Sequence, residues 1–141
     1  MNITYKKETN NTEVNIMLKL YKCAHCGNIV EMVEDKGVNP VCCGELMQEL
    51  VANTTDAAQE KHVPVIEQEG SKVVVKVGSV EHPMLEEHHI SFIILETNKG
   101  VQRKALDPVG SPVAEFVLGE GEEVVAAYEY CNLHGFWKVE A

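Results

Sequence analysis

The sequence is poor in basic side chains for its size. Its 141 residues include 12 Lys and Arg against 22 Asp and Glu, which gives a formal net charge of −10. Binding to the phosphates of nucleic acid requires clustered Lys and Arg, and attraction to an anionic membrane surface requires the same cations. The composition therefore argues against both a nucleic-acid partner and a membrane partner.

Long hydrophobic runs are also missing. No apolar stretch approaches the roughly 18 residues of a membrane-spanning helix, and the N-terminal segment lacks the apolar centre of a signal peptide. Apolar residues nevertheless make up 45% of the chain. A chain of this length can bury about two thirds of its unfolded surface, so a hydrophobic core is expected. We therefore expect a soluble, cytoplasmic protein with one domain, or with one domain and a small module.

Composition divides the chain into three parts. Residues 1–16 are polar and include four Asn, which predicts a flexible N-terminal tail. Residues 17–52 contain four of the five cysteines and little apolar material for a core, which predicts a small module stapled by metal. Residues 53–141 are expected to form the main domain.

Short β-rich runs separated by turn signals fill this third part. Their spacing over about 80 residues predicts an all-β, antiparallel sandwich or barrel, and no helical heptads or internal repeats interrupt the pattern. The predicted strands are Val63–Gln68, Lys72–Val77, Ile90–Thr97, Val101–Leu106, Val113–Leu118, Val124–Cys131 and Phe136–Val139.

Four of the cysteines form two close pairs. Cys23 and Cys26 stand in a CxxC turn, Cys42 and Cys43 are adjacent, and a glycine follows each pair. Four thiolates in two pairs suit a tetrahedral metal site. Because neighbouring side chains diverge in an extended chain, the adjacent pair requires a bent backbone and predicts a distorted tetrahedron. A structural zinc and a redox-active Fe(Cys)4 centre both stay open, since both metals accept four thiolates. A thiol-redox CxxC motif would leave the second pair without a purpose.

Three further motifs carry histidines and the fifth cysteine: EKHVP at 60–64, HPMLEEH at 82–88 and CNLHG at 131–135. On one straight strand the two histidines of the second motif would lie ~20 Å apart, so Pro83 is expected to fold the loop back between them. The third motif has the spacing of a two-ligand metal knuckle. A single His is more often a surface or core residue, but three such motifs in one small β domain predict a metal site. The candidate ligands are His62, His82, His88, Cys131 and His134, whereas His25 and His89 stay unassigned.

The order and spacing of these motifs resemble desulfoferrodoxin, the two-iron class of superoxide reductase. The CxxC…CC cluster resembles the desulforedoxin-type module of the same family. The resemblance extends from Met17 to Ala141, and the 16-residue leader departs from the usual pattern. It implies an immunoglobulin-like antiparallel sandwich for the main domain, a homodimer and a rubredoxin-like electron donor.

The resemblance also implies two non-haem irons. An Fe(Cys)4 centre would be held by Cys23, Cys26, Cys42 and Cys43. In an Fe(His)4(Cys) centre, the four imidazoles of His62, His82, His88 and His134 would lie in a plane with Cys131 as the axial ligand. Superoxide would bind the remaining open position and be reduced to hydrogen peroxide, in defence against oxidative stress.

Two charged residues directly before His62 gain possible roles from the same resemblance. Lys61 would attract superoxide and organise a proton-delivering water, and Glu60 would enter the site after turnover and help the product to leave. Without the resemblance, a solvated surface ion pair is an equally good interpretation of both.

Other functions remain open at this point. An iron-containing electron-transfer protein without catalysis would need only the four-Cys centre, and a zinc-stapled β adaptor would need no redox metal. A non-haem iron oxygenase fits less well, because its usual ligand set is two His and one carboxylate.

Overall fold

The computed structural model describes residues 3–7, 12–16 and 18–141. The chain divides into two compact units, Met1–Leu50 and Val51–Ala141, close to the predicted boundary between residues 52 and 53. In the first unit, β1 (Ile3–Lys7) and β2 (Thr12–Ile16) pair as an antiparallel hairpin. The remaining residues of the predicted tail lie outside the described part, and its flexibility stays a prediction.

The first unit also contains five very short strands. A three-stranded antiparallel sheet has the order β4-β3-β7, and β5 and β6 form a separate hairpin. Its described buried hydrophobic side chains are Leu20, Tyr21, Cys23 and Met47, and the last three form a cluster with Met32 and Cys42 packed against it. So small a core supports the expectation that this unit needs a metal to fold. The bounds are β3 (Leu20–Lys22), β4 (Ile29–Glu31), β5 (Val41–Cys42), β6 (Glu45–Leu46) and β7 (Gln48–Glu49).

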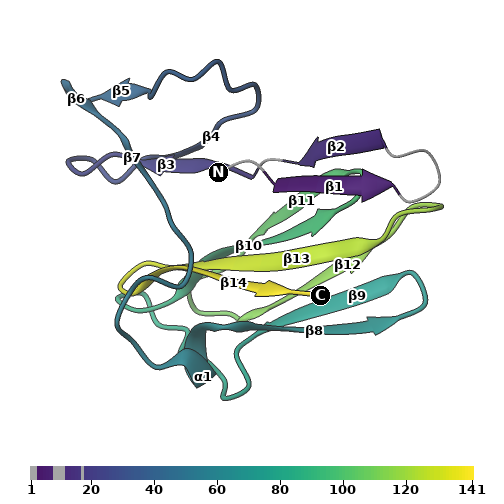
Figure 1. Ribbon diagram of the computed structural model, residues 1–141. Helices are drawn as coiled ribbons and strands as arrows, with labels where there is room; N and C mark the ends of the chain where they lie inside the picture. The colour runs from purple at the N-terminus through teal and green to yellow at the C-terminus, as the bar shows by residue number, and fades with distance from the viewer. Residues whose placement is uncertain (1–2, 8–11, 17) are drawn as a thin grey trace. The chain divides into compact units, whose positions relative to one another are not determined.

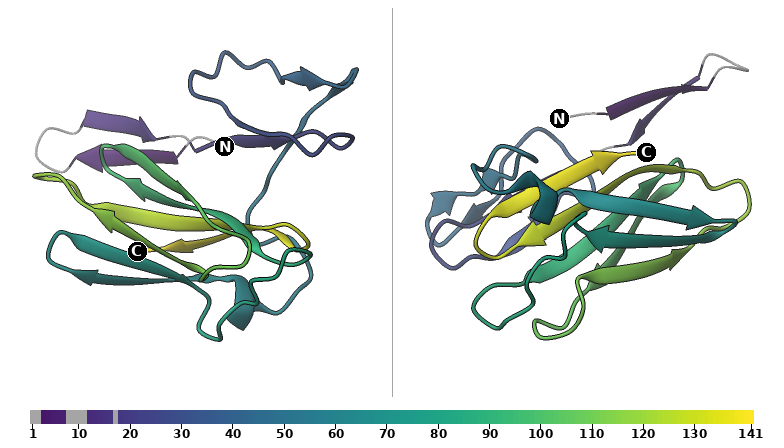
Figure 2. Two further views of the ribbon diagram at one scale, coloured as in Figure 1. Left: turned by 180° about the vertical axis from the view of Figure 1, so that it is seen from behind. Right: turned by 90° about the horizontal axis from the view of Figure 1, so that it is seen from below.

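The second unit is a sandwich of two antiparallel sheets, visible as two layers in Figures 1 and 2. One sheet has the strand order β11-β10-β13-β14 and the other β12-β9-β8. This arrangement confirms the predicted all-β class and the seven-stranded antiparallel sandwich. The bounds are β8 (Pro64–Glu69), β9 (Lys72–Val77), β10 (Ile90–Thr97), β11 (Gly100–Ala105), β12 (Val113–Val117), β13 (Val124–Cys131) and β14 (Gly135–Glu140).

Side-chain alternation places the core between the two sheets. In β9 every second residue is buried, with Val73, Val75 and Val77 at most 1% exposed, while the residues between them are more accessible. They pack with Phe116 of β12 and with the inner faces of β10 and β13. Burying an aliphatic or aromatic side chain of this size contributes roughly 1.5–3 kcal/mol. The core thus gives the second unit a stable framework that ends at the buried Cys131.

The predicted strands agree closely with the observed ones, and β9, β10 and β13 have the predicted bounds. The first strand of the second unit, β8, begins at Pro64, one residue later than predicted, because α1 (Gln59–His62) occupies the preceding turn. Within the described residues, no helix is long and apolar enough to cross a membrane.

Candidate metal centres

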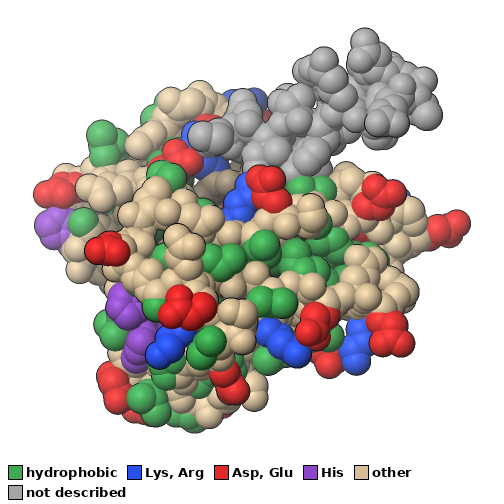
Figure 3. All heavy atoms as spheres, turned by 60° about the horizontal axis from the view of Figure 1, so that its bottom comes forward, with side chains coloured by type: hydrophobic (Ala, Val, Ile, Leu, Met, Phe, Trp, Pro, Cys, Tyr) green, Lys and Arg blue, Asp and Glu red, His purple; other side chains and the backbone are tan. Residues whose placement is uncertain are grey.

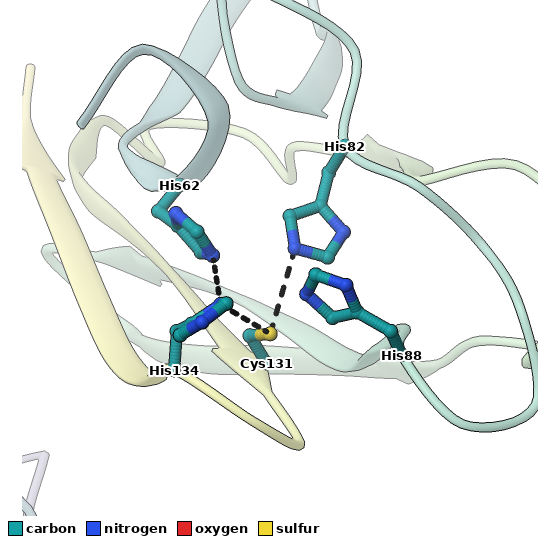
Figure 4. A group of neighbouring side chains, drawn as sticks. All are labelled: His62, His82, His88, Cys131 and His134. Atoms are coloured by element: carbon teal, nitrogen blue, oxygen red, sulfur yellow. Dashed lines mark hydrogen bonds between the residues drawn. The ribbon is translucent and has the colours of Figure 1, made fainter. Parts of the chain in front are cut away.

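Five donor side chains gather at one end of the sandwich (Figure 4). They come from α1, from the loop between β9 and β10, from the end of β13 and from the turn before β14. One donor atom from each side chain lies within 4.8 Å of every other. The structure therefore brings together all five ligands predicted from the sequence, which are His62, His82, His88, Cys131 and His134.

The four imidazoles form a closed ring. Neighbouring ring centroids are 4.8 Å apart for His62 and His82, 4.6 Å for His82 and His88, 5.0 Å for His88 and His134, and 4.9 Å for His134 and His62. Each pair meets edge to face, at interplanar angles between 73° and 85°. Four imidazoles can direct a nitrogen toward a common centre in this arrangement.

Hydrogen bonds to backbone carbonyls orient two of the rings. The Nδ1 atoms of His62 and His82 each lie 2.7 Å from a carbonyl oxygen, of Ala58 and Pro83 respectively. A carbonyl can only accept, so Nδ1 carries the hydrogen and Nε2 presents its lone pair to the site. The Nε2 of His88 is buried without a hydrogen-bond partner. An inward-facing imidazole nitrogen with no partner fits a metal ligand.

Burial favours the neutral, metal-binding form of these imidazoles. Desolvation lowers the pKa of His82 to about 4 and also lowers the pKa values of His62 and His88. Burial raises the pKa of the Cys131 thiol, against the lowering effect of the backbone N–H groups of Leu133 and His134. A cation among the five donors would offset the cost of a buried thiolate.

The chain holds α1 against the loop that carries His82. The backbone N–H of Val80 donates to the Glu60 carbonyl at 2.9 Å, and the Ser79 hydroxyl donates to the same oxygen at 3.3 Å. A side chain at Gly78 would place Cβ only 2.7 Å from this carbonyl oxygen. A glycine is therefore needed for His62 and His82 to approach each other.

Cys131 and His134 lie on either side of the turn between β13 and β14. Cys131 pairs with Gly135 across the hairpin, and Gly135 has a φ of 84°, a conformation that suits glycine. Trp137 stacks on His62 with ring centroids 5.0 Å apart and donates its indole N–H to the His134 carbonyl at 3.1 Å. No motif predicted this supporting role of Trp137, and its only signal in the sequence is a lone Trp close after CNLHG.

A pocket of about 240 Å³ opens over the imidazole ring. All four ligand histidines line it, whereas Cys131 is fully buried and is not part of the lining. Lys61 is also in the lining, but Glu60 is not. In Figure 3, histidine side chains reach the surface beside a basic side chain and acidic ones. The site is thus accessible from the side opposite the sulfur.

The second group of donors is the four-cysteine cluster of the first unit. One atom from each of Cys23, Cys26, Cys42 and Cys43 lies within 4.8 Å of the others. The bent backbone predicted for the adjacent pair is present, because Cys43 and Gly44 have φ values of 52° and 78°. They form the two-residue turn between β5 and β6, where positive φ at both positions matches the twist of the strands.

Hydrogen bonds make these thiols unequal. The backbone N–H groups of Cys26 and His25 point at the Cys23 sulfur and lower its pKa to about 6. Hydrogen bonds of the Cys42 thiol to the sulfurs of Cys26 and Cys23 favour its protonated form and raise the pKa of Cys42 to about 12. The four sulfurs therefore cannot all ionise at neutral pH unless a cation balances them, which fits a tetrathiolate metal site.

The two unassigned histidines lie outside both donor groups. The exposed His25 has its Nε2 atom 3.1 Å from a carboxylate oxygen of Glu45. His89 lies next to a ligand, but its Nδ1 lies 2.9 Å from the Leu85 carbonyl oxygen, which can only accept a hydrogen bond. Of the adjacent pair, only His88 belongs to the donor group found among the described residues.

Comparisons with known proteins agree with this architecture. The family model described as desulfoferrodoxin matches residues 54–140, and that described as the desulfoferrodoxin N-terminal domain matches residues 16–50. A desulfoferrodoxin from Nitratidesulfovibrio vulgaris is 50% identical over 123 residues, which cover 87% of this chain and 96% of the relative. A superoxide reductase from Pyrococcus horikoshii is 39% identical over 98 residues, covering 57% of this chain and 85% of the relative.

A solved structure gives the same picture. The crystal structure of the superoxide reductase from Treponema pallidum superimposes with a TM-score of 0.76 at 40% identity, covering 88% of this chain and 99% of that chain. The two donor groups are those expected for the two iron centres of such proteins. With its two matching domains and its two donor groups, the chain belongs to the desulfoferrodoxin family.

Proposed function

We propose that this chain is a superoxide reductase, which converts superoxide, one electron and two protons into hydrogen peroxide. One observation carries the proposal: four imidazole nitrogens and one thiol sulfur, drawn from four segments of the chain, converge beneath an open pocket. Relatives named superoxide reductase share both the sequence and the fold. An iron ion held by these donors would supply the one-electron redox chemistry and a coordination position open to a small anion.

The surrounding residues hold this donor set ready. The carbonyls of Ala58 and Pro83 fix the rings of His62 and His82, so these donors need little reorganisation. The fully buried Cys131 is shielded from water, and its sulfur accepts hydrogen bonds from the backbone N–H groups of Leu133 and His134. Because the pocket is lined by the rings and not by the sulfur, a substrate entering there would meet the site opposite Cys131. In this arrangement Cys131 would hold the metal from the buried side and leave the pocket side to a small anion.

We assign proton delivery and substrate attraction to α1. Lys61 lines the pocket and is the basic side chain in that lining, so its ammonium can attract superoxide and hold a proton-delivering water. Glu60 precedes it on the same turn, outside the lining. We propose that its carboxylate enters the pocket after turnover and helps the product to leave.

The electron donor, the assembly and the location complete the proposal. The family resemblance favours a rubredoxin-like donor and a homodimer. We propose a cytoplasmic location, because a reducing compartment keeps clustered thiols such as those of the four-cysteine group available to a metal.

The yield of peroxide tests the proposed reaction. The purified, iron-loaded chain would receive a known dose of superoxide from pulse radiolysis, with ascorbate as the reductant. A reductase forms one hydrogen peroxide for each superoxide consumed, whereas a dismutase forms one for every two and releases dioxygen. A yield of one half with dioxygen release would contradict the proposal, and an electron-transfer protein without catalysis would leave the spontaneous decay of superoxide unchanged.

A further inference from the structure

Asn132 lies between two of the ligands and holds the loop that carries a third. Its side-chain oxygen accepts the backbone N–H of His89 at 2.8 Å, and its side-chain nitrogen donates to the Glu87 carbonyl at 3.0 Å. Its own backbone N–H donates to the His89 carbonyl at 3.1 Å. These three hydrogen bonds bracket His88 from both sides and join it to the turn of Cys131 and His134.

The ligand His88 has particular need of such support. The rings of His62 and His82 are each held by a carbonyl, but the hydrogen bonds described for His88 are those of its backbone. That backbone forms a two-way bridge with Leu85, at 2.9 and 3.1 Å. The Leu85 carbonyl also accepts a hydrogen bond from the His89 ring at 2.9 Å. The loop is therefore held by its own hydrogen bonds, and the hydrogen bonds of Asn132 connect it to the turn that carries Cys131 and His134.

We propose that Asn132 is a positioning residue of the reductase centre, whose side chain fixes His88 against the Cys131–His134 turn. The inference rests on the proposed ligand set. Partners of this kind typically change metal affinity or activity by about 10- to 100-fold when removed. Asn132 is a member of neither the pocket lining nor the donor set, so any effect on the site is transmitted through the ligands.

The molecule contains a matched control. At the turn after β10, Asn98 accepts the backbone N–H of Glu123 at 2.8 Å and donates to the Gly121 carbonyl at 3.2 Å. Its own backbone N–H donates to the Glu123 carbonyl at 3.0 Å. The hydrogen-bond pattern is the same as that of Asn132, but its partners Gly121 and Glu123 do not flank a member of either donor group. Asn98→Ala thus removes the same bonds without touching a ligand loop.

The experiment measures the release of iron from the full, Fe²⁺-loaded chain to a chelator, with the four-Cys centre as a reference within the same molecule. In Asn132→Ala, we expect release from the His/Cys centre to be about 10- to 100-fold faster, with release from the four-Cys centre unchanged. Asn98→Ala should lower the melting temperature about as much as Asn132→Ala does. It should nevertheless release iron at the wild-type rate. Asn132→Asp keeps the acceptor for the His89 N–H and loses the donor to Glu87, so its release rate should lie between those of wild type and alanine.

The inference fails if Asn132→Ala keeps its iron as the wild type does, or if Asn98→Ala releases it equally fast. If the alanine variant does not fold, Asn132→Asp decides, because a wild-type release rate in that variant also overturns the inference. His88→Ala is measured in parallel. Iron retention in His88→Ala would contradict the proposed ligand set itself, whereas loss in His88→Ala with retention in Asn132→Ala would refute only the role of Asn132.

Discussion

The two donor groups differ in how the chain builds them. The four cysteines come from one stretch between residues 23 and 43, in a unit whose described residues include only four buried hydrophobic side chains. Two of these cysteines, Cys26 and Cys43, are exposed. The His/Cys group gathers residues between positions 62 and 134 on the end of a sandwich with an extensive core. We therefore expect the first site to depend on a metal for its organisation, whereas the second site is largely formed by the fold around it.

This contrast agrees with what each group can do chemically. A tetrathiolate site with four protein donors is closed, which suits a structural or electron-transfer role. The His/Cys group has five donors and a pocket over its imidazole face, so a small ligand can approach. A site that must leave one position open needs a rigid framework, since its ligands cannot close around the metal.

The largest effect should follow removal of metal from the whole chain. After chelation, residues 18–50 should lose their amide protection, because apparent metal-binding energies of about 10–16 kcal/mol exceed anything their small core can supply. The strands of the second unit should stay protected through their own core. Hydrogen exchange read by mass spectrometry checks both expectations, and reloading with iron or zinc is the control. Protection that survives in residues 18–50 would show that this unit folds without metal.

Replacing the buried sulfur ligand should separate the two centres. Cys131→Ser should reduce the rate of superoxide reduction at least about tenfold, since even the indirect partners of a ligand contribute that much. The sandwich should remain folded, because the side chain keeps its size. Cys42→Ser is the comparison, as it alters only the four-Cys centre. Pulse radiolysis and metal analysis measure the outcome, and a wild-type rate in Cys131→Ser would remove this residue from the ligand set.

Removing the cation in the pocket should slow the approach of substrate. Lys61→Ala should lower the second-order rate with superoxide about tenfold at low ionic strength, because a charged pocket raises the association rate of an anion by this order or more. Iron content should not change. Lys76→Ala is the matched control, since Lys76 pairs with Glu67 outside the pocket lining. Equal rates for the two variants, or an unchanged salt dependence in Lys61→Ala, would contradict the assigned role.

The smallest predicted effect concerns a buried acid in the sandwich. Burial raises the pKa of Glu96, against the lowering effect of a 2.7 Å hydrogen bond from the Tyr128 hydroxyl. Above the ordinary carboxyl pKa, the unfolded chain releases a proton that the folded chain keeps, so the free energy of unfolding falls as pH rises. Near pH 8, the free energy of unfolding of Glu96→Gln should therefore exceed that of wild type by on the order of 1 kcal/mol. Near pH 4, the two free energies should be nearly equal.

Glu122→Gln provides a control of opposite sign. The Thr97 hydroxyl and the Gly119 N–H lower the pKa of Glu122, so its charged form stabilises the fold above the ordinary carboxyl pKa and less so as pH falls. The glutamine variant should lose stability near pH 8. Chemical denaturation at both pH values measures the two variants, and a Glu96→Gln variant without any pH-dependent gain would contradict the stated effect of burial.

Most of the sandwich and all the metal-donor residues could be predicted from local patterns. Alternation in Lys72–Val77 defined β9, and the motifs around His62, His82 and Cys131 indicated the second site. Supporting contacts between distant segments could not be predicted. Neither the stacking of Trp137 on His62 nor the contact of Gly78 with the Glu60 carbonyl leaves a periodic signal in the sequence.

The sequence by itself determined which side chains can bind a metal, since donor type and short-range spacing are local properties. Tertiary structure decided which nitrogen of each imidazole faces inward, because that depends on carbonyls such as Ala58 and Pro83. It also decided that the sulfur lies buried while the histidines line the pocket. The physical reason is that orientation and solvent access arise only when segments far apart in the chain pack together.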